Sequence, residues 1–372
     1  MPRQARIDIW LVLPVTLLVI LGIVMIYSAS AFVAVKKNQP QYYFLVRQLV
    51  WTMIGAGVLS LVIRVDYRTY RRWARMSVVG VIVFLVAVFV PFIGHFKGGV
   101  RRWIGLGPVD FQPSELAKIG LMIFLAAVLA AKREPFLKNG WKAILPELGV
   151  VGLSLVLIML EPDLGTTITL AASLGALLFV GGLRLRPLLI CGGSGLLAVS
   201  VSLYFNAYQR ARVSTFLDPW SVAQGKGYQT VQAFLALGRG GIAGTGPAGS
   251  RQKLFFLPAP HTDFILAVIG EELGFIGLVL VVGLFGVILW RGMRIALRAP
   301  DLFGTYLAFG LTFCLFLQAV INIMVVAGLM PTKGLTLPFL SYGGTSLVAS
   351  LVAVGILLNI SQHSVSAKAD QG

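Results

Sequence analysis

Ten apolar runs constrain this chain more than any other feature of its sequence. A membrane span needs about 17–25 mostly apolar residues. In lipid, every backbone polar group must be paired within the protein, so such runs favour α-helices. The runs lie at 9–29, 44–63, 75–93, 115–131, 143–160, 166–182, 187–205, 264–290, 302–329 and 344–361. The sequence therefore predicts an all-α polytopic membrane protein, with ten transmembrane helices in one integral membrane domain covering residues 1–372.

The composition agrees with a membrane protein. Hydrophobic residues make up 57% of the chain and charged residues only 12%, whereas soluble domains carry about 25% charged residues. The formal net charge is +17. Most basic residues lie in short loops between the apolar runs, so we assign this charge to membrane topology and anionic lipid headgroups. No nucleic-acid partner is predicted.

The distribution of basic residues orients the chain. The loops on the side of the two termini hold 17 Lys and Arg residues, and the short loops on the other side hold seven. The positive-inside rule then places both termini in the cytoplasm. Residues 363–372 are predicted to be a disordered cytoplasmic tail.

The long segment 206–262, between the seventh and eighth runs, is predicted to be extracytoplasmic. It is rich in glycine but also contains aromatic residues, which disordered linkers lack. We therefore expect it to fold partly against the membrane face, with short amphipathic helices near Gln229–Leu237.

Asp263 stands at the mouth of the eighth run, in the sequence HTDF. Acidic groups in or beside a bilayer cost free energy and usually mark function. The alternative is a helix-capping role, because acidic side chains stabilise helix N-termini. Glu271 and Glu272 follow in the same run, on faces that differ from that of Asp263. We expect one of these glutamates to pair with an arginine or a neighbouring helix.

Two further motifs place ionisable groups at the ends of spans. In FQPSELAK, Glu115 and Lys118 are three residues apart, so they share a helix face and can pair. Either they form a self-neutralised ion pair, or Lys118 faces a wet cavity and binds an anion. In EPDLGT, Asp163 belongs to an outer turn with two carboxylates, which is either solvated or part of a site.

Basic residues of the outer loops are candidates for binding phosphate, because arginine matches phosphate oxygens in a fork geometry. Anchoring at the membrane surface is the alternative reading. The segment PTKGLTLPFLSYGG contains two prolines and three glycines and cannot be regular helix. The candidates are Arg101, Arg102, Arg210, Arg212 and, in this last segment, Lys333.

These segments together resemble one family, the SEDS proteins (shape, elongation, division and sporulation) of bacterial cell-wall synthesis. The matching pieces are FQPSELAK, EPDLGT, YQRARV, HTDFILAVIGEELGFIG and PTKGLTLPFLSYGG, in the order of the family. The lysine in KGLTLPF and the GEELG sequence are similar to the division branch, FtsW, and its sporulation relative SpoVE.

The resemblance implies a peptidoglycan glycosyltransferase that acts on lipid II, the undecaprenyl-pyrophosphate-linked disaccharide peptide. It implies a catalytic role for Asp263 and a cavity role for Glu115, Lys118 and Asp163. It also implies a class B penicillin-binding protein as partner and a location in the bacterial cytoplasmic membrane, at the division septum.

A carboxylate can act as general base on the acceptor sugar hydroxyl. Attack on an α-linked donor to give a β-linkage inverts the anomeric carbon and needs no covalent enzyme intermediate. The lipid pyrophosphate that leaves needs positive charge, from Lys118, loop arginines or a divalent cation such as Mg²⁺ or Mn²⁺. No cofactor is predicted from a motif.

Two other functions fit parts of the pattern. A lipid II flippase would also need a polar cavity and a charged pair, although these carboxylates gather at the outer face rather than at the midplane. A non-enzymatic scaffold that activates a class B penicillin-binding protein would leave the acidic cluster unexplained. The sequence contains no nucleotide-binding phosphate loop, HExxH or GxSxG motif that would indicate another reaction.

Overall fold

The computed structural model describes residues 7–97, 100–106, 109–205, 210, 214–225, 227–250, 252–253, 257, 260–332 and 334–369. Within this part the chain is a bundle of long helices. The long helices are α1 Ile9–Lys36, α2 Tyr43–Arg64, α3 Tyr67–Ala87, α4 Pro113–Ala131, α6 Leu145–Leu160, α7 Leu164–Val180, α8 Leu185–Phe205, α11 Ile265–Leu297, α12 Leu302–Val326 and α13 Gly344–Ala369. Each coincides with one predicted apolar run.

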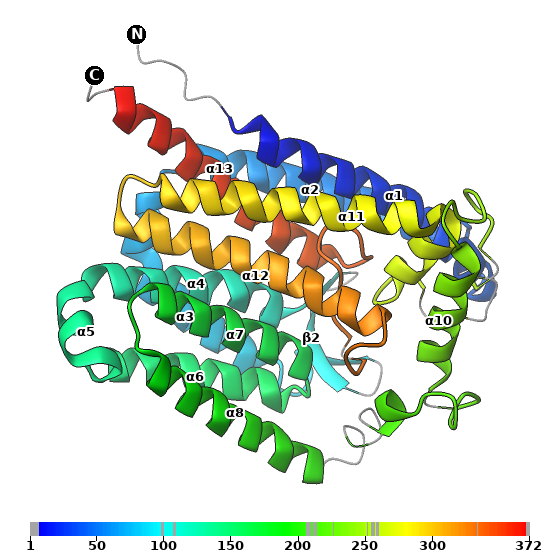
Figure 1. The fold of residues 1–372 in the computed structure, drawn as a ribbon, viewed down its shortest axis with the longest axis horizontal. Helices are drawn as coiled ribbons and strands as arrows, with labels where there is room; N and C mark the ends of the chain where they lie inside the picture. Colours follow the sequence, from blue (N-terminus) through cyan, green and yellow to red (C-terminus); the bar gives the residue numbers. More distant parts are fainter. Residues whose placement is uncertain are drawn as a thin grey trace.

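Seven helices in the described part are long and apolar enough to span a membrane, and α7 is a shorter apolar helix. The predicted all-α membrane fold is confirmed, whereas the count of ten spans stays a prediction. α1 begins and α13 ends at the same end of the bundle (Figure 1), as the predicted location of both termini requires. Which side of the membrane this end faces stays a prediction.

Two boundaries differ from the prediction. α3 begins at Tyr67 rather than residue 75, because Asp66 accepts a hydrogen bond from the Arg68 backbone N–H and caps the helix. Several arginines expected in a loop therefore lie on the first turns of α3. The predicted disordered tail is also wrong in part, because α13 continues to Ala369.

α12 lies near the centre of the bundle, where it packs against α4, α7, α11 and α13. The outer connection between α3 and α4 forms a three-stranded antiparallel sheet that the sequence did not predict. Its strands are β1 Gly94–Lys97, β2 Val100–Leu106 and β3 Val109–Phe111, in the order β1-β2-β3. α5 Arg133–Asn139 and the 3-10 helix η1 Gly140–Ile144 join α4 to α6 at the other end of the bundle.

The outer segment 206–262 is partly folded, as predicted, and contains the amphipathic helix α10, Tyr228–Gly240. α10 packs against α11 and lies at the end of the bundle away from the beginning of α1 and the end of α13 (Figure 1). The sheet strand β2 lies toward that end as well (Figure 1). These two elements and the start of α11 surround the candidate site.

α11 is broken at Gly274, whose φ of 66° and ψ of −163° are not helical. The backbone groups that the break releases are paired by the segment after α10. The Glu271 and Glu272 carbonyls accept hydrogen bonds from the N–H groups of 245 and 246, at 2.9 and 3.1 Å. The N–H groups of Phe275 and Ile276 donate to the carbonyls of 241 and 242, at 2.9 and 3.2 Å. Unpaired backbone groups are costly in a membrane protein, so this exchange stabilises both the break and the outer segment.

Candidate functional site

The HTDF segment is held by its backbone. The His261 carbonyl accepts a hydrogen bond from the Tyr342 backbone N–H at 2.8 Å. The Thr262 carbonyl accepts from the Ser341 hydroxyl at 2.7 Å, and the Asp263 carbonyl accepts from the Asn322 side-chain amide at 3.0 Å. Two of these donors belong to the non-helical segment before α13, and the third belongs to α12. The position of the Asp263 backbone is therefore determined by segments distant in sequence.

Asp263 is not the N-cap of α11, so the N-cap interpretation is wrong, whereas interaction of its charge with the helix N-terminus stays an alternative. The helix begins at Ile265 with Phe264 as its N-cap, and no side-chain capping bond is made. The preceding His261 ring is buried between aromatic rings, 4.5 Å from Phe44 and 5.5 Å from Tyr342 between centroids. Burial, and secondarily the charge of Lys37, lowers the pKa of His261 to about 4. His261 is thus a neutral packing group at physiological pH.

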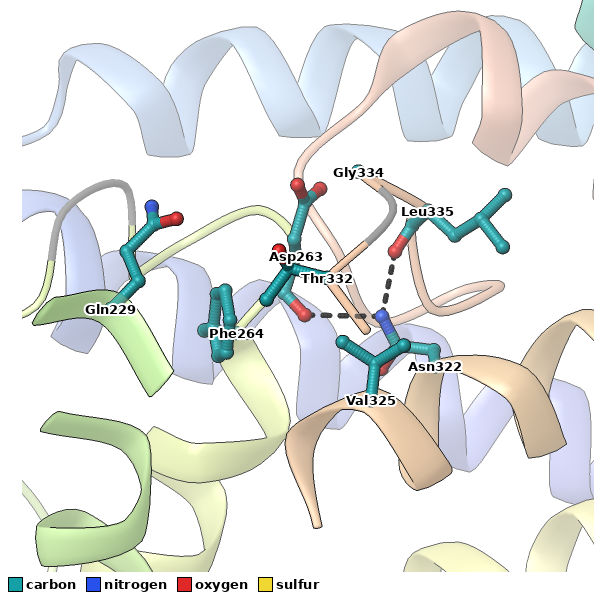
Figure 2. Close-up of a pocket in the computed structure, with 8 residues that line it drawn as sticks. All are labelled: Gln229, Asp263, Phe264, Asn322, Val325, Thr332, Gly334 and Leu335. Atoms are coloured by element: carbon teal, nitrogen blue, oxygen red, sulfur yellow. Dashed lines mark hydrogen bonds between the residues drawn. The ribbon is translucent and has the colours of Figure 1, made fainter. Parts of the chain in front are cut away.

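A small pocket opens beside Asp263, and Figure 2 shows the side chains around it. Its volume of about 20 Å³ leaves room for roughly one water molecule. It is lined by Gln229 of α10, Asp263 and Phe264 before α11, Asn322 and Val325 of α12, and Thr332, Gly334 and Leu335. Four separate segments therefore meet at the Asp263 carboxylate.

Arg102 brings positive charge to the same place. It extends from β2, where neighbouring side chains point to opposite faces. A side-chain carbon added at Gly334 would lie 3.6 Å from Asp263 Oδ2 and 3.8 Å from Arg102 Nη1. The same Nη1 lies 4.0 Å from Asp163 Oδ1. Arg102 thus lies between the two carboxylates, whereas Arg101 is exposed.

The EPDLGT turn between α6 and α7 is not solvated, so that interpretation is wrong. Glu161 is 0% and Asp163 1% exposed. Arg102 donates from Nε to the Glu161 carbonyl at 3.0 Å and from Nη2 to the Pro162 carbonyl. The positive charge that the sequence motif lacks is therefore supplied by the outer sheet.

The two carboxyl groups of this turn differ. Asp163 caps α7, accepting from the Thr166 N–H at 3.2 Å and its hydroxyl at 2.9 Å, and lies 3.3 Å from Gln112 Nε2. The carboxyl oxygens of Glu161 have no hydrogen-bond partner among the described residues. Burial, followed by the negative charge of Asp163, raises the pKa of Glu161 to about 9, and Arg102 opposes this shift. Glu161 is therefore protonated near neutral pH.

Glu115 and Lys118 form the predicted ion pair. Lys118 Nζ lies 2.7 Å from Glu115 Oε2, and their side chains are only 9% and 5% exposed. Lys118 also donates to Gln318 Oε1 of α12 at 2.5 Å. The pocket beside Asp263 is not lined by Glu115, Lys118 or Asp163, so their predicted common cavity stays a prediction.

The other basic candidates are not brought to Asp263 within the described part. Arg210 is exposed and donates from Nη1 to the Tyr204 carbonyl at 2.9 Å, at the end of α8. Arg212 and Lys333 lie outside the described residues.

Gln318 and Asn322 are site residues that the sequence analysis missed. Both are 1% exposed and lie within the apolar run at 302–329. Polar amides four residues apart share one face of a helix, and polar groups within spans are commonly functional or structural. That spacing was the signal that could have identified them.

A divalent cation is one of the predicted sources of positive charge. The described residues contain no group of three or more His, Cys, Asp or Glu side chains that could hold a metal ion. The predicted Mg²⁺ or Mn²⁺ ion stays a prediction.

Known proteins resemble this chain over nearly its whole length. The model of the cell cycle protein family that groups FtsW, RodA and SpoVE matches residues 9–366. Stage V sporulation protein E of Bacillus subtilis is 43% identical, over 97% of this chain and 99% of that protein. The probable peptidoglycan glycosyltransferase FtsW of Geobacter sp. is 41% identical, over 97% of this chain and 98% of that protein.

Solved structures share the fold. A chain of a peptidoglycan synthase complex, described as coordinating polymerization and crosslinking, has a TM-score of 0.80 and 33% identity, over 96% of this chain and 98% of that one. The rod shape determining protein RodA of Thermus thermophilus has a TM-score of 0.70 and 31% identity, over 95% of this chain and 96% of that one. The resemblance predicted from five motifs is confirmed, and the chain belongs to the family of FtsW, RodA and SpoVE.

Proposed function

We propose that this protein is a peptidoglycan glycosyltransferase that polymerises lipid II, with Asp263 as its general base. The observation that carries this assignment is the position of Asp263, which lines a pocket and whose carboxylate faces Gly334 together with Arg102. Relatives at 41–43% identity include proteins named peptidoglycan glycosyltransferase FtsW, and this supports the activity.

The reaction forms one glycosidic bond and breaks one bond to phosphate. The acceptor sugar hydroxyl attacks the anomeric carbon of the donor, while its proton passes to the Asp263 carboxylate. The bond from the anomeric carbon to the pyrophosphate oxygen breaks, and the lipid pyrophosphate leaves as an anion. The configuration inverts in a single displacement, so no covalent enzyme intermediate is needed.

Arg102 is the candidate to stabilise the charge of the leaving group. Preorganised cations lower the barrier where negative charge develops, and a guanidinium matches phosphate oxygens in two-point contacts. Arg102 is held by two backbone carbonyls of the turn between α6 and α7, which fixes its orientation. Lys118 is the second candidate cation, but its charge is already matched by Glu115 at 2.7 Å.

Substrate binding must enlarge the pocket. Its volume of about 20 Å³ is far below the roughly 300–1,000 Å³ of ordinary ligand sites. The lining segments that belong to loops or to the outer helix, around Gln229 and Thr332, are those that can move without disturbing the spans. We expect them to separate when lipid II binds.

The partner and location follow as further proposals. We expect this chain to work with a class B penicillin-binding protein that cross-links the new glycan, since a structural relative belongs to a peptidoglycan synthase complex. We place the protein in the bacterial cytoplasmic membrane, at the division septum, with both termini in the cytoplasm. A cysteine at position 249, which is exposed in the outer segment, should be labelled by an impermeant reagent in intact cells. Protection of that site would reverse the topology.

Purified Asp263→Asn protein tests the activity. Asparagine keeps the size of the side chain but removes the base, so polymer formation from labelled lipid II should fall by about 10²–10⁴-fold, while the protein stays folded. Asp218→Asn is the matched control, because Asp218 is an exposed carboxylate of the same outer segment and its loss should leave the rate unchanged.

The same assay separates the competing functions. A flippase would move labelled lipid II across liposomes and form no polymer, even as unmodified protein. A scaffold would form polymer only through an active site of its partner, so Asp263→Asn would have no effect. Polymerisation at the normal rate by Asp263→Asn protein would falsify the catalytic assignment.

A further inference from the structure

Two buried amides on α12 hold one short segment of backbone. Gln318 and Asn322 are four residues apart, so they lie on the same face of the helix. Gln318 Nε2 donates to the Thr336 carbonyl at 2.9 Å, and Asn322 Nδ2 donates to the Leu335 carbonyl at 2.6 Å. Successive carbonyls are therefore fixed by successive turns of α12.

The same two amides also hold the charged groups of the site. Gln318 Oε1 accepts from Lys118 Nζ at 2.5 Å. Asn322 Nδ2 donates a second hydrogen bond, to the Asp263 carbonyl at 3.0 Å, which Figure 2 shows together with the bond to Leu335. Lys118 of α4 and Asp263 before α11 are thereby connected to one another through α12 and the Leu335–Thr336 backbone.

We propose that Gln318 and Asn322 are positioning residues, which set the place of Lys118 and Asp263 relative to each other and to the substrate. This inference rests on the proposed glycosyltransferase function. Neither amide is assigned a contact with the reacting atoms. Each acts through the group that it holds.

Burial makes hydrogen-bond partners necessary for both amides. Each amide is 1% exposed, and a buried amide without hydrogen bonds costs several kcal/mol at most and about 1–3 kcal/mol in typical proteins. The Leu335–Thr336 segment is not helical, so its carbonyls need partners from outside the segment. The side-chain amide nitrogens of Gln318 and Asn322 supply these partners from one face of α12.

The held segment lies close to the Asp263 carboxylate. Gly334, next to Leu335, lies against Asp263 Oδ2, with an added carbon there only 3.6 Å away. A shift of the segment therefore changes the surroundings of the carboxylate directly. Misplacement of a reacting group by about 1 Å can reduce a rate by 10²-fold, although the protein stays folded.

Asn322→Leu and Asn322→Asp proteins test the proposal in the lipid II polymerisation assay. We expect Asn322→Leu to lower kcat by about 10–100-fold and to leave KM within about threefold, because the substrate contacts remain. Asn322→Asp turns a carboxylate toward two carbonyl oxygens, and only its protonated form can donate a hydrogen bond. The rate of this variant relative to unmodified protein should therefore rise as pH falls from about 8 to 6.

The charged groups around this position are Asp263, Arg102 beyond Gly334, and the Glu115–Lys118 pair reached through Gln318. These groups are present in both the Asn322→Asp protein and the unmodified protein. Their own titration therefore cancels in the ratio of the two polymerisation rates. A ratio that stays flat across this pH range overturns the proposal. The Asn322→Asp protein also tests the proposal if the Asn322→Leu protein fails to fold. Aspartate has the size of asparagine, and at low pH its protonated carboxyl group can donate a hydrogen bond.

Asn359 of α13 provides a matched control. It is 2% exposed and likewise joins two backbone groups, accepting from the Tyr67 N–H at 2.9 Å and donating to the Ile63 carbonyl at 2.7 Å. It lies fifteen residues along α13 from Gly344, about 22 Å at 1.5 Å per residue. Asn359→Leu should lower thermal stability without the fall in kcat. Equal falls in kcat for the two leucine variants would reduce Asn322 to a structural role.

Hydrogen exchange separates this proposal from the proposed function. The Leu337 N–H donates to the Ser341 hydroxyl at 2.8 Å, and its exchange reports on the held segment without substrate. It should accelerate in Asn322→Leu protein and not in Asn359→Leu protein. If unmodified protein formed no polymer, the glycosyltransferase function would be wrong. If the acceleration still occurred in that case, the proposed connection of Asn322 to the Leu335–Thr336 segment would remain supported. Unchanged exchange in Asn322→Leu protein overturns the connection itself.

Discussion

Lys253 Nζ lies 2.8 Å from Glu272 Oε1, and the two side chains are only 4% and 2% exposed. The lysine belongs to the outer segment and the glutamate to α11, just before its break. Lys253 also donates to the Ser28 hydroxyl of α1 at 2.9 Å. This buried pair therefore ties the outer segment to two helices. The Ser28 hydroxyl of α1 donates to Glu272 Oε1 at 2.6 Å, which confirms the expected pairing of one glutamate with a neighbouring helix, whereas the ion-pair partner is a lysine rather than an arginine.

Removing one member of this pair should be strongly destabilising. Lys253→Met leaves Glu272 buried without its counter-charge, which we expect to lower the free energy of unfolding by about 3–5 kcal/mol. Adding Glu272→Gln should recover part of the loss, because no uncompensated charge remains. Thermal unfolding in detergent measures both. Arg68→Met is the control, since the Arg68–Asp301 pair is 56% and 34% exposed and should contribute at most about 1 kcal/mol.

Gly274→Ala should disrupt the break in α11. With φ at 66°, a Cβ at this position would lie 2.3 Å from the Gly244 N and 2.4 Å from the Ile242 carbonyl oxygen. The backbone strain alone costs about 1–3 kcal/mol, and the clash displaces the outer segment. We expect lower thermal stability and faster proteolysis of that segment.

Gly283→Ala, in the same helix, is the matched control for this substitution. A Cβ there meets nothing within 4 Å, and alanine favours helix by up to about 1 kcal/mol over glycine. Its stability should be unchanged or slightly higher. Equal losses for the two variants would contradict the structural role of the break.

Glu161 should make stability depend on pH. The pKa of this buried carboxyl group is raised to about 9 in the folded protein from 4.5, so between these values the folded state binds more protons than the unfolded state. Stability from this group is therefore lost as pH rises through that window. Glu161→Gln should remove the slope, with a gain in Tm relative to unmodified protein that is larger at pH 8 than at pH 5. The exposed Glu134, changed to Gln, should show no such trend.

Arg102 and Arg101 are neighbours on β2 and should differ sharply. Arg102→Met removes the cation between Asp163 and Asp263, so kcat for polymerisation should fall by about 10²-fold. Arg101 is exposed, and Arg101→Met should change kcat by no more than about twofold, as for ordinary surface substitutions. Similar losses for both would indicate a general requirement for positive charge in the outer sheet rather than a specific site.

Much of the membrane fold could be predicted from the sequence alone. Helix position follows from runs of apolar side chains, because lipid leaves the backbone no other partners, and each long helix coincides with a predicted run. The amphipathic α10 and the Glu115–Lys118 pair were also predictable, because both depend on residues close together in the chain. Asp263 was predicted to be a functional residue because it lies directly before a predicted membrane span.

The tertiary structure decided what depends on residues far apart in the chain. Arg102 reaches the EPDLGT turn only because an unpredicted sheet forms between α3 and α4. Glu161 is buried, and this burial raises its pKa against the opposing charge of Arg102. No local pattern in EPDLGT reveals that burial. Asn322 and Gln318 look like isolated amides in an apolar run until the Leu335–Thr336 segment is placed against α12. Local propensity and hydrophobicity thus determined the helices, whereas long-range hydrogen bonds and burial determined the site.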